Sequence, residues 1–165
     1  MNSNVALRDL LKCFEKYYTI FEEPLFPFSA TAVFKSHNEQ YFLVKNAKIA
    51  DIDSSDFVFF YDCHEDGKKE LSAKLLEDLC KTAWQKGLEN VKPYYGHRNS
   101  DVTLVIVAEG ITKDLVKRVK KINYYKSYKF GFFGWSAFRL ALVESESGKV
   151  YVNHRGSDLK KLTGN

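Results

Sequence analysis

Side chains that could bind a ligand or assist a reaction lie shortly before the most apolar run of the sequence, residues 102–108. A histidine titrates near neutral pH and can act as a general base, and an arginine can anchor an anion. Loops that lead into a central strand often carry such groups. We therefore expect a ligand-binding site at Tyr95, His97 and Arg98. The alternative is a surface loop that packs its tyrosines and exposes the other side chains.

A second candidate surface is strongly basic. Seven cations lie within residues 113–129, and only Asp114 opposes them there. Tyr124, Tyr125 and Tyr128 are interleaved with these cations. Cations that neutralise phosphates, and rings that stack on bases, suit a surface for single-stranded nucleic acid. The same lysines could instead form the solvated face of an amphipathic helix and of an edge strand. The candidate nucleic-acid-binding residues are Lys113, Lys117, Arg118, Lys120, Lys121, Lys126 and Lys129.

Two other polar stretches are typical of turns. Residues 62–66 gather Asp, Cys, His and Glu just past a predicted strand. Adjacent residues rarely ligate one ion, however, and a strand directs Cys63 and His64 to opposite faces. The glycines of residues 131–135 favour a tight turn or bulge around aromatic side chains. Since the sequence contains no phosphate-loop, nucleophile-elbow or zinc-protease motif, we expect no catalytic set, no metal and no cofactor.

Apolar periodicity predicts the elements that position these groups. Helical spacing occurs at residues 5–18, 72–87 and 112–122, with Asn4 and Ser72 as candidate caps. Gly87 suits the end of the second helix. Strand patterns occur at residues 28–36, 40–49, 57–61, 102–108, 124–130, 135–143 and 149–153, and a short closing helix is predicted at residues 157–162.

These elements predict one α+β domain over residues 1–165, with a mostly antiparallel sheet flanked by helices in the order αβββαβα-βββα. Short connections between the first three strands indicate a meander. The strand at residues 102–108 is apolar on both faces, which is typical of the middle of a covered sheet. The predicted core contains Leu11, Phe14, Val33, Phe42, Phe59, Leu75, Leu79, Leu104, Ile106, Val119, Phe138 and Leu140.

Composition bounds the class of protein. The chain has 165 residues, of which 45% are hydrophobic and 28% charged, so it is neither a disordered chain nor a membrane span. The net charge of +4 is mild and alone implies no polyanionic partner. Its three cysteines are odd in number and lack C-x-x-C spacing, and Cys13 and Cys80 fall on predicted apolar helix stripes. We therefore expect a soluble, cytoplasmic protein without disulfides and without membrane contact.

The first elements, αβββαβ, resemble the core order of restriction-endonuclease-like nucleases. That family carries a carboxylate, one residue and a lysine on its third strand, whereas residues 56–62 here have no lysine after a carboxylate. The resemblance therefore implies topology without the metal-dependent chemistry. Separately, residues 40–43 and 130–136 resemble patterns of an uncharacterised bacterial domain family with no assigned activity.

The sequence leaves three functions open. We favour a non-catalytic binding or interaction module, because no catalytic set is visible. A nucleic-acid-binding domain that uses residues 113–129 is the first alternative. An enzyme whose site lies near His97 and Arg98, or in the Cys63-His64 turn, is the second. The expected partners are thus a nucleic acid or a protein.

Overall fold

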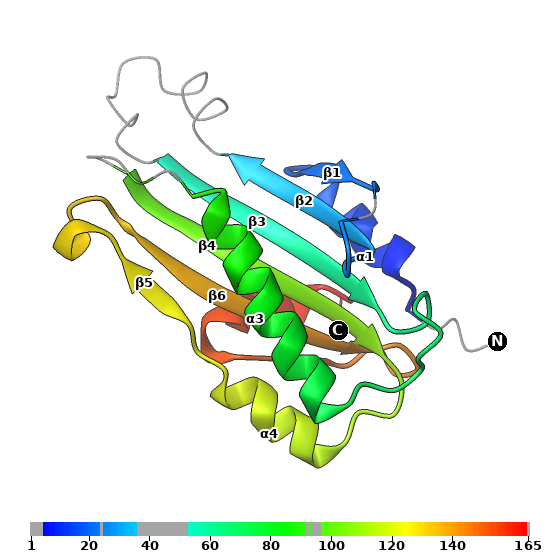
Figure 1. Cartoon of the computed structure of the whole chain (residues 1–165). Helices are drawn as coiled ribbons and strands as arrows, with labels where there is room; N and C mark the ends of the chain where they lie inside the picture. Colours follow the sequence, from blue (N-terminus) through cyan, green and yellow to red (C-terminus); the bar gives the residue numbers. More distant parts are fainter. Residues whose placement is uncertain (1–4, 24, 36–52, 92, 94–96, 165) are drawn as a thin grey trace.

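The described residues form a seven-stranded mixed sheet with helices on both faces (Figure 1). The computed structural model describes residues 5–23, 25–35, 53–91, 93 and 97–164. The predicted strand at residues 40–49, with Phe42, and the predicted cap Asn4 lie outside the described residues. The strands are β1 (Thr19–Phe21), β2 (Ala30–Lys35), β3 (Asp53–Asp62), β4 (His97–Ala108), β5 (Tyr125–Ser127), β6 (Trp135–Glu144) and β7 (Val150–Val152). The helices are α1 (Leu7–Phe14), α3 (Ala73–Glu89), α4 (Lys113–Lys121) and the 3₁₀ helices η2 (Lys129–Gly131) and η3 (His154–Lys161).

The strands follow the order β1-β2-β3-β4-β6-β5, and β7 also pairs with β6. Four of the six described pairings are antiparallel, which confirms the prediction of an α+β fold with a mostly antiparallel sheet. The two central pairings, β3 with β4 and β4 with β6, are parallel. In each case the chain returns to the same end of the sheet before the second strand begins, through α3 between β3 and β4, and through α4 and β5 between β4 and β6.

The sheet separates two apolar layers. Helices α3 and α4 cover the face seen in Figure 1, and α1 and η3 lie behind the sheet. Strand β4 supplies both layers: Leu104 and Ile106 pack under the helices in front, and Val105 and Val107 pack on the other side. The prediction of a central strand that is covered on both faces is therefore confirmed.

Helix α3 begins where the sequence predicts and ends two residues later. Ser72 is its cap, and its side chain accepts a hydrogen bond from the Leu75 amide. Gly87 lies inside the helix, so the prediction that it ends the helix is wrong. A Cβ atom at Gly87 would lie 2.4 Å from Cγ2 of Val102. This glycine is therefore a point of close approach between α3 and β4.

Helix α1 is shorter than predicted and begins after Ala6. Leu10 and Phe14 are buried as its apolar spacing indicates, but Tyr17 lies beyond the helix and is exposed. The prediction that Cys13 lies on the apolar stripe is wrong, since this thiol is exposed, whereas Cys80 is buried. The described part of the predicted core is otherwise confirmed, with Val33 and Leu75 only partly buried.

Two elements in the last third of the chain also differ from their predicted limits. The closing helix is the 3₁₀ helix η3, which begins at His154 rather than at residue 157. Strand β5 spans three residues, because the chain leaves the sheet into η2 after Ser127. No helix in the described ranges has the length and apolar character needed to cross a membrane.

Candidate functional site

A buried ionic network lies on the sheet face that carries α1 and η3. The carboxylate of Asp56 in β3 is buried and accepts hydrogen bonds from the Tyr18 hydroxyl at 2.8 Å and the Thr103 hydroxyl at 2.7 Å. The Arg139 guanidinium of β6 donates to the same carboxylate at 3.0 Å. Burial raises the pKa of Asp56, and Arg139 with the two hydroxyl donors opposes that rise. This carboxylate thus joins β3, β4 and β6 to Tyr18, the residue just before β1.

Arg139 extends the network to the surface. Its second terminal nitrogen donates to the Asp158 carboxylate of η3, while the first holds Asp56. The arginine side chain is only 14% exposed, and the carboxylates of Asp56 and Asp158 bind its two terminal nitrogens. Arg139 therefore has its charge matched by protein groups and presents little free charge to a ligand.

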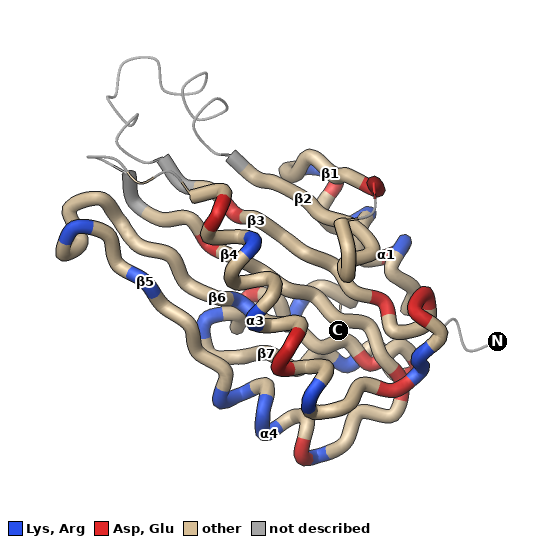
Figure 2. Tube along the Cα trace, viewed as in Figure 1, with Lys and Arg blue, Asp and Glu red and all other residues tan. Residues whose placement is uncertain are grey.

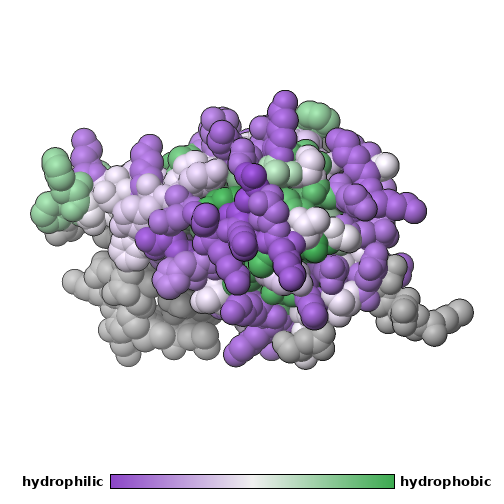
Figure 3. Space-filling model, turned by 90° about the horizontal axis from the view of Figure 1, so that it is seen from below, coloured by the Kyte–Doolittle hydropathy of each residue, from purple (hydrophilic) through white to green (hydrophobic). Residues whose placement is uncertain are grey.

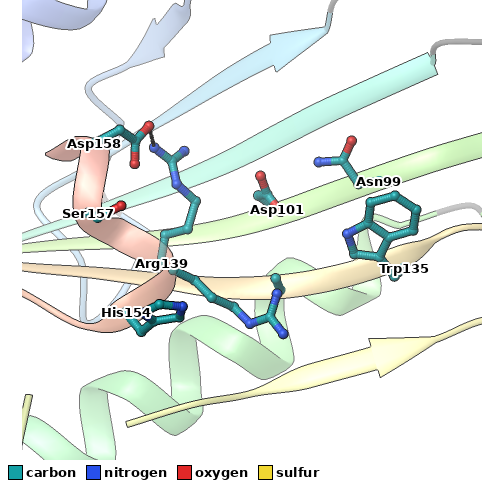
Figure 4. Close-up of a pocket in the computed structure, with 9 residues that line it drawn as sticks. Asn99, Asp101, Trp135, Arg139, His154, Ser157 and Asp158 are labelled. Atoms are coloured by element: carbon teal, nitrogen blue, oxygen red, sulfur yellow. Dashed lines mark hydrogen bonds and ion pairs between the residues drawn. The ribbon is translucent and has the colours of Figure 1, made fainter. Parts of the chain in front are cut away.

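Beside Arg139 the surface is hollowed by a cavity of about 550 Å³, which we call the β4–β6 groove. In Figure 4, Asn99, Asp101 and Trp135 lie around the opening, and Arg139 and Asp158 pair at its other side. The strand register explains the convergence, because Asn99 of β4 lies opposite Trp135 of β6. The groove is lined by Asn99, Asp101, Trp135, Ala137, Arg139, His154, Arg155, Ser157 and Asp158.

Asp101 is the carboxyl group of this groove whose pKa the surroundings raise. Asp101 lies directly opposite Asp56 in the parallel register of β3 and β4, so the two carboxylates are cross-strand neighbours. Burial and then the charge of Asp56 raise the pKa of Asp101 to about 6, whereas Arg139 and a hydrogen bond from Asn99 oppose the rise. A strongly shifted carboxyl group in a cleft is typical of a functional site.

The outer wall of the groove is held by Asn153, the cap of η3. Its buried side chain accepts hydrogen bonds from the amides of Leu140 at 2.9 Å and Gly156 at 3.0 Å. The same side chain donates to the carbonyls of Phe138 at 2.9 Å and Ile122 at 3.1 Å. A single amide therefore joins β6, η3 and the end of α4, and it fixes His154, Arg155 and Asp158 over the sheet.

The predicted ligand-binding residues lie next to this groove in the sequence. His97 and Arg98 are the first two residues of β4, and the strand continues into Asn99 and Asp101. The side chains of His97 and Arg98, and the whole of Tyr95, lie outside the described residues. The prediction of a site in this stretch thus falls on the strand that lines the groove, and the three named residues stay a prediction.

The predicted basic surface follows α4, β5 and η2. Figure 2 shows blue positions along α4 and β5, and Figure 3, turned to show this side, is largely hydrophilic. Arg118 is bound to Asp114 at 2.8 Å and to Glu77 at 3.2 Å, so its charge is already paired. The exposed lysines on these elements are Lys113, Lys117, Lys120, Lys121, Lys126 and Lys129.

The aromatic residues of this stretch divide between core and surface. Tyr124 packs against Trp84 and Phe138, so its ring belongs to the core. Tyr125 is half exposed, with the Arg155 guanidinium 4.8 Å from its ring centre. The residues that follow add two exposed rings, Phe130 at 99% and Phe132 at 69%. Figure 3 shows a hydrophobic projection at its left edge, where Figure 1 places the β5–β6 connection.

The turn at residues 62–66 is a hydrogen-bonded strand end. His64 lies between two carboxylates, with Nδ1 2.9 Å from Asp62 and Nε2 2.7 Å from Glu109. Cys63 is buried, and burial together with the charge of Asp62 raises the pKa of its thiol to about 12, so the thiol is a weak nucleophile. Within the described ranges, no group of three His, Cys, Asp or Glu side chains is placed to hold a metal ion.

Sequence reasoning missed the residues that the groove brings together. Asp56, Asp101 and Arg139 each stand at the edge of, or inside, an apolar strand pattern: FVFFY, VTLVIVA and AFRLAL. A charge in such a pattern must find a partner or a cavity, because an unpaired buried charge is costly. That signal was present in each strand, but it did not show that the three charges lie on one face.

The comparisons with known proteins define a family. No curated protein matches the chain, and no solved structure matches it. The model of one protein family, described as a domain of unknown function (DUF8052), matches residues 2–164. This match confirms the resemblance to an uncharacterised domain family, and with nearly every residue covered the chain belongs to the DUF8052 family.

Proposed function

We propose that this chain is a non-catalytic binding domain that holds a small polar molecule in the β4–β6 groove. The observation that carries the proposal is the convergence of polar side chains from β4, β6 and η3 on one cavity of about 550 Å³. This volume lies within the range of roughly 300–1,000 Å³ that is usual for small-molecule sites.

The contacts in the groove favour binding over catalysis. Arg139 is held by two carboxylates, and Asp56 by three donors, so neither is free to move a proton or to change partners in a reaction. Rigid, mutually satisfied groups beneath a cavity are what keep a binding surface in one shape. Asp101 and Trp135 are then the groups that a ligand would meet at the opening.

A groove-filling variant tests this proposal. Ala137 lines the groove, so Ala137→Leu adds three carbon atoms that project toward the cavity. Ligand-observed NMR of mixtures of small polar compounds should find binders of the wild type whose signal is lost with Ala137→Leu. Lys81→Leu, on the exposed side of α3, adds apolar surface far from the groove and should leave binding unchanged.

Urea unfolding would first establish that Ala137→Leu is folded. If no compound bound the wild type, or if every bound compound also bound Ala137→Leu equally well, the groove would not be the binding site.

A second candidate function is binding of single-stranded nucleic acid along α4, β5 and η2. The observation that favours it is the pair of exposed rings, Phe130 and Phe132, beside Lys126 and Lys129. Exposed rings can stack on bases while the lysines neutralise phosphates. We expect labelled single-stranded oligonucleotides to bind with an affinity that falls steeply with salt.

Fluorescence anisotropy at low and moderate salt would measure that binding. The triple variant Lys117→Glu, Lys120→Glu and Lys121→Glu should abolish it, and Phe130→Ala should weaken it with little change in salt dependence. Binding that survived the triple charge reversal would exclude this surface.

A further inference from the structure

The β4–β6 groove carries an unbalanced charge, and this determines the class of molecule that it suits. Three carboxylates, Asp56, Asp101 and Asp158, lie in or beneath it. Arg139 bonds to the first and the last of them. Asp101 takes part in no ion pair among the described residues, and its described hydrogen-bond partner is the neutral amide of Asn99. Among the described side chains, this carboxylate is thus partly buried and bonded to no cation, and the charge of Arg139 acts on it only from a distance.

Arg155, the other arginine of the groove, is engaged away from Asp101. Its guanidinium lies over the ring of Tyr125, and its Nε donates to Asn123 at 3.3 Å. A partly buried carboxylate is disfavoured when no cation bonds to it directly. Burial, and then the charge of Asp56, raise the pKa of Asp101, so its ionised form lacks full compensation. A cation supplied from outside would relieve it, whereas an anion would meet repulsion.

An aromatic ring stands beside this carboxylate. Trp135 is opposite Asn99 in the register, and Asp101 lies two residues farther along β4 on the same face of the sheet. Diagonal neighbours of this kind on adjacent strands are about 7–8 Å apart at the backbone. A positive group placed between them could touch the face of the indole and the carboxylate at once. Trp135 is 38% exposed, so its ring is accessible from the opening.

On the basis of the proposed function, we infer that the ligand of the groove is a small organic cation with N–H donors, a primary ammonium or a guanidinium, held between the Asp101 carboxylate and the Trp135 ring. Asp101 accepts the N–H donors and matches the charge. Trp135 covers the apolar stem next to the charge. Arg139 and Asp158 act by positioning, because their ion pair fixes the opposite wall of the groove.

The pH dependence of binding follows from Asp101. The charged groups that face it are Asp56 from β3, Arg139 from β6, and His154, Arg155 and Asp158 from η3. Cation binding requires the ionised carboxyl group, whose pKa is about 6 in the free protein. The affinity for a cation should therefore be greatest above pH 7 and fall by about tenfold per pH unit once the pH is well below 6.

Four probes built on a four-carbon chain and differing in charge test the inference on the intact chain: putrescine, agmatine, 1,4-butanediol and succinate. Trp135 fluorescence and NMR chemical shifts should show saturable binding of putrescine and of agmatine, and none of butanediol or succinate. Asp101→Asn should weaken putrescine binding at least tenfold. Glu146→Gln, which removes an exposed carboxylate outside the groove, should leave it unchanged.

Three results would overturn the inference of a cationic ligand. Butanediol or succinate bound as tightly as putrescine, and lost in Ala137→Leu, would overturn the cation inference and keep the groove as a binding site. Failure of both cations to bind the wild type would also overturn the inference. So would putrescine binding that Asp101→Asn left unchanged, since the carboxylate would then not be the counter-ion.

Discussion

Asp56 and Asp101 are cross-strand neighbours with opposite surroundings. Asp56 is surrounded by Tyr18, Thr103 and Arg139, which all donate to it. Asp101 opens onto the groove with a single described hydrogen bond, from Asn99. Removal of the charge should therefore affect the two positions in opposite directions, although both changes are Asp→Asn.

Asp101→Asn should stabilise the chain at neutral pH. Its carboxyl group titrates near 3.8 without the fold and at about 6 within it. Between these values the folded chain holds more protons than the unfolded chain, so stability falls as the pH rises. We expect Asn at position 101 to raise the free energy of unfolding at pH 7.5 by about 1 kcal/mol, with the gain vanishing below about pH 4. Urea unfolding at several pH values measures this.

Asp56→Asn is the matched control for that measurement. It leaves Arg139 without one of its carboxylates and removes a charge-assisted acceptor, so a loss of about 2 kcal/mol is expected at pH 7.5. If both variants lowered the free energy of unfolding equally, the Asp101 carboxylate would stabilise the fold as Asp56 does, and it would not be a group left unpaired for a ligand.

At the scale of the elements, the contact between α3 and β4 leaves no room for a side chain at Gly87. The Gly87 backbone approaches Val102 so closely that a single methyl group would overlap both of its Cγ atoms. The contact sets the height of α3 above the central strand. It therefore has a direct effect on the strand that carries Asn99 and Asp101 into the groove.

Gly87→Ala should destabilise the chain even though alanine favours helices. The helical preference would contribute about 1 kcal/mol in favour of alanine, while the overlap with Val102 costs about 1–3 kcal/mol. We expect a net loss in urea unfolding and recovery of most of it in the double variant Gly87→Ala, Val102→Ala. If the two single losses simply added, the overlap would not be the cause.

Asn153 fixes the position of η3 on the sheet, as the close contact at Gly87 fixes the position of α3. Four hydrogen bonds from one buried amide attach η3 to β6 and to the end of α4. Gly156 completes the attachment, because a side chain there would meet the Asn153 amide oxygen at 2.8 Å and the Leu140 carbonyl at 2.9 Å. The outer wall of the groove is thus part of the core packing.

The two ends of the sheet have different chemistry. The groove lies toward the amino ends of the parallel strands β4 and β6, where Asn99 and Trp135 are. At the carboxyl ends, His64 bridges the end of β3, through Asp62, and Glu109 just past β4. Hydrogen bonds to Glu109 and Asp62 raise the pKa of His64 above its ordinary value. This end is held more firmly when His64 is protonated.

The stability of the whole molecule should therefore contain a histidine-dependent part. Because the folded pKa of His64 is raised, its contribution is complete below the ordinary value of 6.5 and is lost as the pH rises through the folded value. The side chain is 35% exposed, so the effect is small, about 0.5 kcal/mol. We expect His64→Gln to lower the midpoint of urea unfolding at pH 6 more than at pH 9. His154→Gln, at an exposed position, is the control.

Local patterns were sufficient to predict much of the fold. The helices α3 and α4, the Ser72 cap, the buried strand of β4 and the alternation of strands and helices depend on contacts within a few residues, so local patterns show them. The three-residue strand β1 has no such pattern, and it was missed. The parallel centre of the sheet was also missed, because the order of elements alone does not fix the direction in which distant strands pair.

The candidate site depended on that pairing. Arg139 reaches Asp56 across 83 positions of sequence, and Asp101 lies between them on β4. Each of these residues could be recognised in the sequence as a charge near an apolar strand. Their meeting on one face follows from the order and register of β3, β4 and β6, which are set by packing of the whole sheet between its two helical layers. The sequence alone thus determined the elements and their polar positions, whereas the tertiary structure decided which of those positions form a groove, since contacts between distant strands are not encoded in any local pattern.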